Sequence, residues 1–202
     1  FIIDFTNNSV EKYSQSDYGK EDVIEITLYL QNKEVRQYLS WAIWSMYRGG
    51  GSPVVPYLLQ SIHMALEKTL LEFSEVLKPE VTEQILIKIL EKSESASMSA
   101  IVCSIVLAHP NKFYNVALIL SKTIEFFHMD SIRGSNEFHT KSSYSIGYGL
   151  NKIKDILYTD ERIKTCDDKH RNSNLESLFL NYQFFGVNGF TEEQNAKFIE
   201  KL

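Results

Sequence analysis

The chain has 202 residues, of which 44% are hydrophobic and 23% are charged, as in ordinary soluble globular proteins. This length suffices for a sizeable hydrophobic core without support from disulfides or metals. The 21 basic and 26 acidic residues give a net charge of −5, which provides no electrostatic attraction to nucleic acid or to an anionic membrane surface. We therefore expect no nucleic-acid partner.

The two cysteines lie in different surroundings, Cys103 in an apolar run and Cys166 in a charged one. Because two cysteines are too few for a disulfide framework, we expect a reducing, cytoplasmic setting. The chain starts at Phe1 without a basic or cleavable apolar leader, which leads us to expect a fragment of a longer protein. The apolar run 100–120 is interrupted at its centre by the polar residues 110–112, so no membrane span is expected.

The N-terminal part predicts one short strand. Residues 1–5 form a short apolar segment, and residues 6–21 are polar and typical of a loop. Over 22–30, apolar and polar side chains alternate with the two-residue period of a half-buried strand, although the same residues would also pass as a helix. A strand needs a partner, so we expect a small β-hairpin, formed with residues 34–38 or with the N-terminal segment.

Glycine, proline and apolar periodicity predict five helices in the middle of the chain: 38–48, 53–76, 81–92, 93–108 and 111–127. The first ends at three consecutive glycines, and Ser52 is the predicted N-cap of the second. Helix 93–108 has large apolar residues on one side and small ones on the other, so we expect it to be buried on both sides. The predicted inner face of helix 53–76 comprises Leu58, Ile62, Ala65, Leu66, Thr69, Leu70 and Phe73.

The composition changes at residues 130–145, where small polar side chains replace the apolar periodicity. We interpret this segment as a mobile loop or a sub-domain boundary. Beyond it, helices are predicted at 146–158 and 174–185. Thr191 and Gln194 have the spacing of a capping box before a last helix.

Together these patterns predict a mainly α protein in which residues 1–202 form a single helical domain. Short turns place sequential helices beside each other, in an irregular helical bundle or in a degenerate α-solenoid of antiparallel helix pairs. No fixed repeat period supports a regular solenoid.

No stretch carries a catalytic, cofactor-binding or metal-binding signature. The glycine-rich run 48–53 could hold a phosphate at a helix N-terminus, but a helix end followed by a helix start explains the same residues. Cys166 and His170 could bind zinc, but without a second pair of ligands a solvated loop is the favoured interpretation. We therefore assign no catalytic residue, no cofactor and no metal ligand.

One group of residues is a candidate ligand pocket: Trp44, Tyr47, Arg48 and His63. The aromatic residues follow each other at helical spacing, and a basic side chain adjoins them. Core packing of the aromatic rings is the competing interpretation.

Three runs carry a family resemblance: SWAIWSMYRGGGSPVVPYLLQSIHMALEK, SIVLAHPNKFYNVALILSKTIEFF and NLESLFLNYQFFG. They resemble stretches of very large bacterial ATP-binding proteins related to signal-transduction ATPases with numerous domains. The likeness covers residues 38–128 and 174–186, and it implies a helical region that senses or scaffolds beside a P-loop ATPase module. No nucleotide-binding residue is carried over, because the chain has no Walker A lysine and no Walker B strand.

Two functions are compatible with these observations. The first is a non-catalytic scaffold, regulatory or protein-interaction segment of a larger cytoplasmic bacterial ATPase-like protein, with neighbouring domains of the same chain or a protein partner as its contacts. The alternative is a small helical enzyme or ligand-binding domain with a pocket near Trp44, Tyr47, Arg48 and His63. A closed pocket there would favour the alternative, whereas exposed apolar helix faces would favour the first.

Overall fold

The computed structural model describes residues 1–48, 56–145, 160 and 163–202. It is mainly α-helical with one two-stranded antiparallel sheet, which confirms the predicted fold class. The predicted N-cap Ser52 and the predicted helix 146–158 lie outside the described residues. In chain order the elements are α1 (Ile2–Ser14), α2 (Gly19–Asp22), β1 (Ile24–Tyr29), β2 (Glu34–Leu39), α3 (Trp41–Trp44), η1 (Ser45–Arg48), α4 (Tyr57–Val76), α5 (Pro79–Lys92), α6 (Ala96–Ala108), α7 (Tyr114–Leu120), α8 (Ile124–Ser145), η2 (Lys169–Asn172), α10 (Leu175–Phe185) and α11 (Glu192–Ile199).

Strands β1 and β2 form a hairpin in which Ile24 faces Leu39 and Tyr29 faces Glu34. The predicted strand and its pairing with residues 34–38 are therefore confirmed. Gln37 fixes the hairpin to the beginning of α6, since its Nε2 donates to the Ser93 carbonyl over 2.9 Å. Its Oε1 accepts a hydrogen bond of 2.7 Å from the Ser99 hydroxyl.

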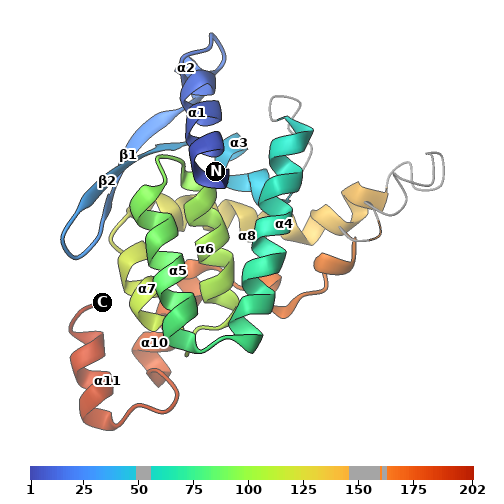
Figure 1. Cartoon of the computed structure of the whole chain (residues 1–202). Coiled ribbons are helices and arrows are strands. Elements are labelled where there is room, and N and C mark those ends of the chain that lie inside the picture. Colours follow the sequence, from blue (N-terminus) through green and yellow to red (C-terminus); the bar gives the residue numbers. More distant parts are fainter. Residues whose placement is uncertain (49–55, 146–159, 161–162) are drawn as a thin grey trace.

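Helix α6 lies at the centre of the fold, with α4, α5 and α7 around it (Figure 1). Every residue from Ala96 to Leu107 is buried, which confirms the predicted burial on both sides. Helix α6 contacts β2 and α3 as well as η2 and α10, which lie far apart in the sequence. Because a solenoid repeat contacts only its neighbours, this arrangement is an irregular bundle around one central helix.

Helix α4 turns a largely polar side toward the core, so most of its predicted inner face is wrong. The buried residues are Leu59, Gln60, His63, Glu67, Leu70 and Ser74, and only Leu70 belongs to the predicted set. Leu58 is 65% exposed and Phe73 is 38% exposed. The physical reason lies in α6, whose Ser97 and Ser104 hydroxyls give the polar side chains of α4 hydrogen-bond partners inside the bundle.

Residues 130–145 are helical, so the predicted loop is wrong, whereas the alternative of a sub-domain boundary stays a prediction. They belong to α8, which runs from Ile124 to Ser145. Two of their polar residues are used inside the protein: Asp130 is 1% exposed, Arg133 is 3% exposed, and their Oδ1 and Nε atoms lie 2.7 Å apart. The polar residues of this segment include a buried ion pair, and by composition alone they cannot be told from the polar residues of a loop. For this reason the sequence pattern predicted a loop instead of a helix.

Residues 6–21, expected as a loop, are helical over most of their length, in α1 and α2. Long-range contacts hold α1, which buries Thr6 and Val10. The Asn7 amide donates to the Lys92 carbonyl and accepts from the Glu94 N–H, both over 3.0 Å. These partners lie too far along the chain for a local pattern to indicate them.

Two helix boundaries show how side chains decide where a helix ends. The expected helix 111–127 is divided between α7 and α8, and the Thr123 hydroxyl at the break donates to the Thr27 carbonyl over 3.2 Å. The predicted capping box of α11 is confirmed, since Thr191 and Gln194 each bond to the other's backbone N–H.

We expect Ile105→Asp to abolish cooperative folding, because Ile105 is fully buried in α6. An unpaired charge there costs several kcal/mol, against a total stability of about 5–15 kcal/mol. Ile124→Asp is the matched control, since Ile124 is 73% exposed. Thermal unfolding by circular dichroism measures both variants, and equal melting temperatures would contradict the central position of α6.

Candidate functional site

The four residues of the candidate pocket are all buried, but they do not form one site. Trp44 is fully buried, and its ring packs against Phe126 with the ring centroids 5.1 Å apart. Its indole Nε1 has no hydrogen-bond partner among the described residues. Trp44 therefore serves the core, as the competing interpretation of the aromatic stripe held.

Tyr47 and Arg48, at the end of η1, line a cavity of about 370 Å³. Trp44 and His63 are not among its lining residues. Helix α4 supplies much of the opposite wall with Met64, Glu67 and Leu71, and the chain after residue 163 supplies the rest. The structure thus brings together two of the four predicted residues.

Arg48 is held by Glu137 of α8. The guanidinium donates through Nε to Oε1 and through Nη2 to Oε2, the latter over 2.9 Å. Both side chains are only 6% exposed, so this is a buried, two-pronged ion pair. Nothing in the sequence pattern indicates Glu137, because its segment has the composition of a loop.

Both ring nitrogens of His63 are hydrogen-bonded, one within α4 and the other to α6. Its Nδ1 bonds to the Leu59 carbonyl over 2.8 Å, and its Nε2 lies 2.9 Å from the Ser97 hydroxyl. Burial disfavours the charged imidazolium and lowers the pKa of His63 to about 4. His63 is therefore neutral at pH 7 and has a structural role.

A second ion pair lies between the cavity and the core. The Arg171 Nη2 donates to the Glu67 Oε2 over 2.7 Å, and the Ser104 hydroxyl donates to the Glu67 Oε1. The Arg171 guanidinium also lies 5.5 Å from the centre of the Tyr47 ring, within reach of a cation–π interaction. Burial is the main cause that raises the pKa of Tyr47, which keeps its phenol protonated.

The backbone around Arg171 is fixed by α8. Arg133 donates to the Arg171 carbonyl over 3.0 Å and to the Ser173 carbonyl. Asp130 accepts a hydrogen bond of 2.8 Å from the Leu175 N–H at the beginning of α10. The C-terminal part of the chain is therefore attached to the bundle through buried, paired charges as well as apolar contacts.

The sequence contains a signal for this network that apolar spacing alone does not show. Glu67 and Ser74 follow His63 at the spacings of one helix face, so α4 carries a polar stripe beside its apolar one. The small serines of α6 recur at the matching spacing. Two such stripes on neighbouring helices indicate a polar helix–helix contact.

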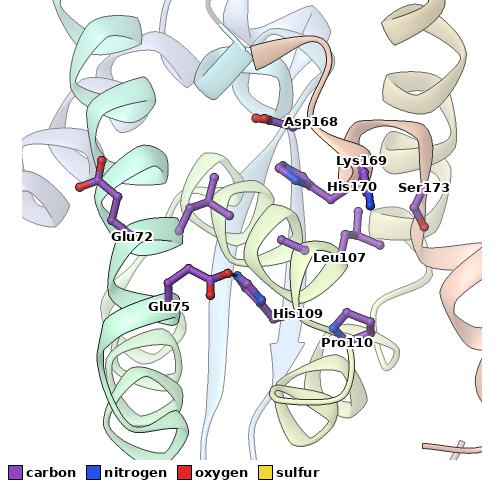
Figure 2. Close-up of a pocket in the computed structure, with 11 residues that line it drawn as sticks. Glu72, Glu75, Leu107, His109, Pro110, Asp168, Lys169, His170 and Ser173 are labelled. Carbon is purple, nitrogen blue, oxygen red and sulfur yellow. Dashed lines mark ion pairs between the residues drawn. The ribbon is translucent and has the colours of Figure 1, made fainter. Parts of the chain in front are cut away.

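A larger hollow of about 630 Å³ lies at the C-terminal end of α6, where α4, His109 and residues 168–173 meet (Figure 2). In Figure 2 the His109 ring lies beside the Glu75 carboxylate, and Glu72 points away from that pair. The His109 Nε2 and the Glu75 Oε1 are 3.5 Å apart. Burial and the nearby Arg171 lower the pKa of His170 to about 3, so His170 is neutral at pH 7.

The polar side chains that line this hollow do not form a catalytic group. Ser173 is its hydroxyl residue, and its Oγ is engaged with the Ser177 hydroxyl at 3.2 Å. A nucleophile needs an adjacent base to be activated, and no hydrogen bond among the described residues joins the Ser173 hydroxyl to a histidine ring. Among the described residues no three His, Cys, Asp or Glu side chains gather as metal ligands.

Both cysteines are free thiols. Burial raises the pKa of Cys103 well above its usual value, so this thiol stays protonated. Cys166 lies 3.6 Å from the Arg48 Nη2, and burial is the main cause that raises its pKa.

Comparison with protein-family models finds no family that matches this chain, and comparison with curated proteins finds no match either. Among the described residues, no helix has the length and apolar character needed to cross a membrane.

We expect Arg171→Met to destabilise the protein by about 3–5 kcal/mol, because it leaves the Glu67 carboxylate buried without its cation. Adding Glu67→Gln should recover at least half of that loss, since the amide carries no charge and can still bond to Ser104. Urea unfolding of the two single variants and the double variant measures the coupling. Strictly additive losses would contradict the pairing.

Stability should fall as the pH drops from about 6.5 toward 4, because the unfolded chain then binds a proton that folded His63 does not. The contribution of His63 is fully present above pH 6.5, and its loss reaches about 3 kcal/mol near pH 4. His63→Gln keeps a donor and an acceptor but does not titrate. Its free energy of unfolding should therefore decrease less over this range, and parallel curves for the two proteins would contradict the assignment.

Proposed function

We propose that this chain is a non-catalytic helical interaction segment that docks a helix of a neighbouring domain or of a protein partner. The observation that carries the proposal is the exposed apolar face of α4. We define this outer face by Leu58, Ile62, Ala65, Thr69, Phe73 and Val76. Leu58 is 65% and Val76 is 76% exposed.

The outer face has the shape of a helix-docking surface. Its members recur at intervals of three and four residues along a helix of 20 residues, which is about 30 Å long. The small Ala65 and Thr69 at its centre would let a second helix approach closely, while larger side chains lie toward both ends. Leu77 and Val81, which are 37% and 45% exposed, continue the apolar surface toward α5.

Helix α4 cannot rotate to bury this face within the bundle. Its opposite side is held by the bonds of His63 to Ser97 and of Glu67 to Arg171. Rotation would expose apolar contacts made by Leu59 and Leu70 and would separate a buried ion pair. Since continuous exposed apolar surface marks interaction sites in soluble proteins, a partner helix is the occupant that this face supports.

The family resemblance adds a context to this proposal. The likeness covers residues 38–128, which include α4, although the similar run 40–68 ends within that helix. In large bacterial ATP-binding proteins such helical regions sense or scaffold beside an ATPase module. The proposed partner is then a neighbouring domain of such a cytoplasmic, ATPase-like protein or a protein that it recognises. The proposed role of this segment is regulatory, and no residue of it is assigned to catalysis.

A ligand-binding domain is the second candidate, favoured by the cavity that Tyr47 and Arg48 line. Its volume of about 370 Å³ is within the usual range of small-molecule sites. Against it, the two arginines of its wall are already paired with Glu137 and Glu67. The interaction surface on α4 is therefore the stronger proposal.

The test uses a fluorescent 18-residue amphipathic helix of Leu, Ala, Lys and Glu as a model partner. We expect saturable binding by fluorescence anisotropy, and at least tenfold weaker binding to the Leu58→Glu/Val76→Glu variant. These positions are exposed, so the melting temperature should stay within a few degrees of the parent protein.

The matched control is Phe184→Glu/Phe185→Glu, which removes an exposed apolar pair on α10, 75% and 80% exposed. This variant should bind the peptide as the parent protein does. Equal losses in both variants would indicate unspecific adhesion to apolar surface, and undiminished binding to the α4 variant would refute the docking face.

A further inference from the structure

A groove of about 600 Å³ runs between β2 and the neighbouring ends of α1 and α5. One wall is formed by six consecutive residues, Lys33 to Tyr38. Side chains of a strand alternate between its two faces, so a groove lined by every residue in a row follows the edge of the strand. The other wall comes from Asp4, Asn7, Glu91, Lys92 and Glu94.

The backbone of β2 is available for pairing along this edge. The Leu30 N–H donates to the Lys33 carbonyl over 2.9 Å, so these two residues form a hydrogen-bonded pair of the ladder. Such pairs alternate along an antiparallel ladder, so every second residue of β2, counted from Lys33, bonds to β1. The N–H and C=O groups of Glu34, Arg36 and Tyr38 consequently point away from β1. The Tyr38 N–H already bonds to the Glu94 carbonyl over 2.8 Å, and no bond within the described residues engages the backbone of Glu34 or Arg36.

Both ends of the groove are bounded. The Lys33 Nζ bonds to the Glu91 carbonyl over 2.7 Å at one end, and the contact between Tyr38 and Glu94 closes the other. Tyr38 also forms a parallel β-bridge with Ser95. The free edge of β2 is therefore already paired with another backbone segment at this end. At about 3.3 Å per residue, the open length between these ends suits about four extended residues.

The opposite edge of the hairpin is covered. The Thr27 carbonyl of β1 accepts the hydroxyl of Thr123, and α7 packs against β1. The buried side chain of Gln37 holds β2 to α6 on the other side of the groove, so the edge is rigid before a ligand arrives. Strand addition is therefore directed to β2.

The groove carries more negative than positive charge. Asp4, Glu25, Glu34, Glu91 and Glu94 line it, against Lys33, Arg36 and Lys92. An extended ligand with basic side chains complements this balance, and one with acidic side chains does not.

We propose that the groove beside β2 binds a short, extended, basic peptide segment of a protein partner by strand addition, with hydrogen bonds to the backbone of Glu34 and Arg36. This site lies on a different surface from the outer face of α4. It is therefore an additional interaction site that does not depend on the helix-docking function.

The probes are acetylated, amidated tetrapeptides, Lys-Val-Lys-Val and Glu-Val-Glu-Val, titrated into the 202-residue chain and followed by amide chemical shifts of residues 33–38. We expect saturable shifts with the basic peptide and at least tenfold weaker binding of the acidic one. Two N-methylated versions of the basic peptide carry the methyl groups on alternate amides. Since only one set of amides faces β2, one version should lose binding and the other should retain it.

The protein variant is Arg36→Pro, which removes a backbone N–H that the ladder with β1 does not use. Edge strands tolerate proline at a position of this kind, so we expect the variant to fold. Its binding of the basic peptide should fall at least tenfold, whereas the control Arg36→Ala should bind at least as tightly as the parent chain. Equal binding by Arg36→Pro and Arg36→Ala would overturn the proposal.

Two further outcomes also decide the proposal. Equal binding of the two N-methylated peptides would overturn it without any protein variant, so a failure of Arg36→Pro to fold leaves the test intact. Concentration-dependent dimerisation of the parent chain that Arg36→Pro removes would identify a second copy as the occupant and would equally overturn the peptide assignment.

Discussion

The ion pair between Glu67 and Arg171 decides which side of α4 faces the core, and much of the structure follows from it. Two charges buried this deeply are tolerated only when they are paired and hydrogen-bonded, and Ser104 supplies the additional bond. Helix α4 must therefore present its polar stripe to α6. The apolar stripe on its other side is left at the surface, although apolar spacing alone would have placed it inside.

The same constraint attaches the C-terminal part of the chain. Arg171 reaches α4 and α6 from η2, Arg133 of α8 holds the backbone beside it, and Arg48 is paired with Glu137. A buried ion pair adds little net stability over an apolar contact, but it is specific, because removing either partner leaves a costly charge. These contacts define where η2 and α8 sit, and they pair the two arginines that line the cavity beside Tyr47 with carboxylates of the protein itself.

The bundle around α6 thus offers two surfaces of different chemistry. The outer face of α4 is apolar and helical, while the groove beside β2 is polar and presents strand backbone. Figure 1 shows α4 and the hairpin on different sides of α6. Both surfaces are held by buried polar side chains, His63 and Glu67 for α4 and Gln37 for β2, so their shapes do not depend on the proposed partners.

The sequence by itself determined the local conformation of much of the chain. Alternation over residues 22–30 indicated β1, apolar and small residues on two sides indicated the central burial of α6, and Thr191 with Gln194 marked the beginning of α11. It also pointed to Tyr47 and Arg48, which line a cavity. These features depend on side chains a few residues apart, which is the range over which spacing and capping act.

Only the tertiary structure decided which helix faces are buried and which polar residues belong to the interior. Arg171 lies 104 residues from Glu67, and Gln37 lies 62 residues from Ser99, so no local spacing indicates either pair. Without its partner each polar side chain looks like surface, which is why residues 130–145 resembled a loop and the apolar side of α4 resembled a core face. A polar group is stable inside a protein only when a specific partner reaches it, and that partner is fixed by how distant segments pack.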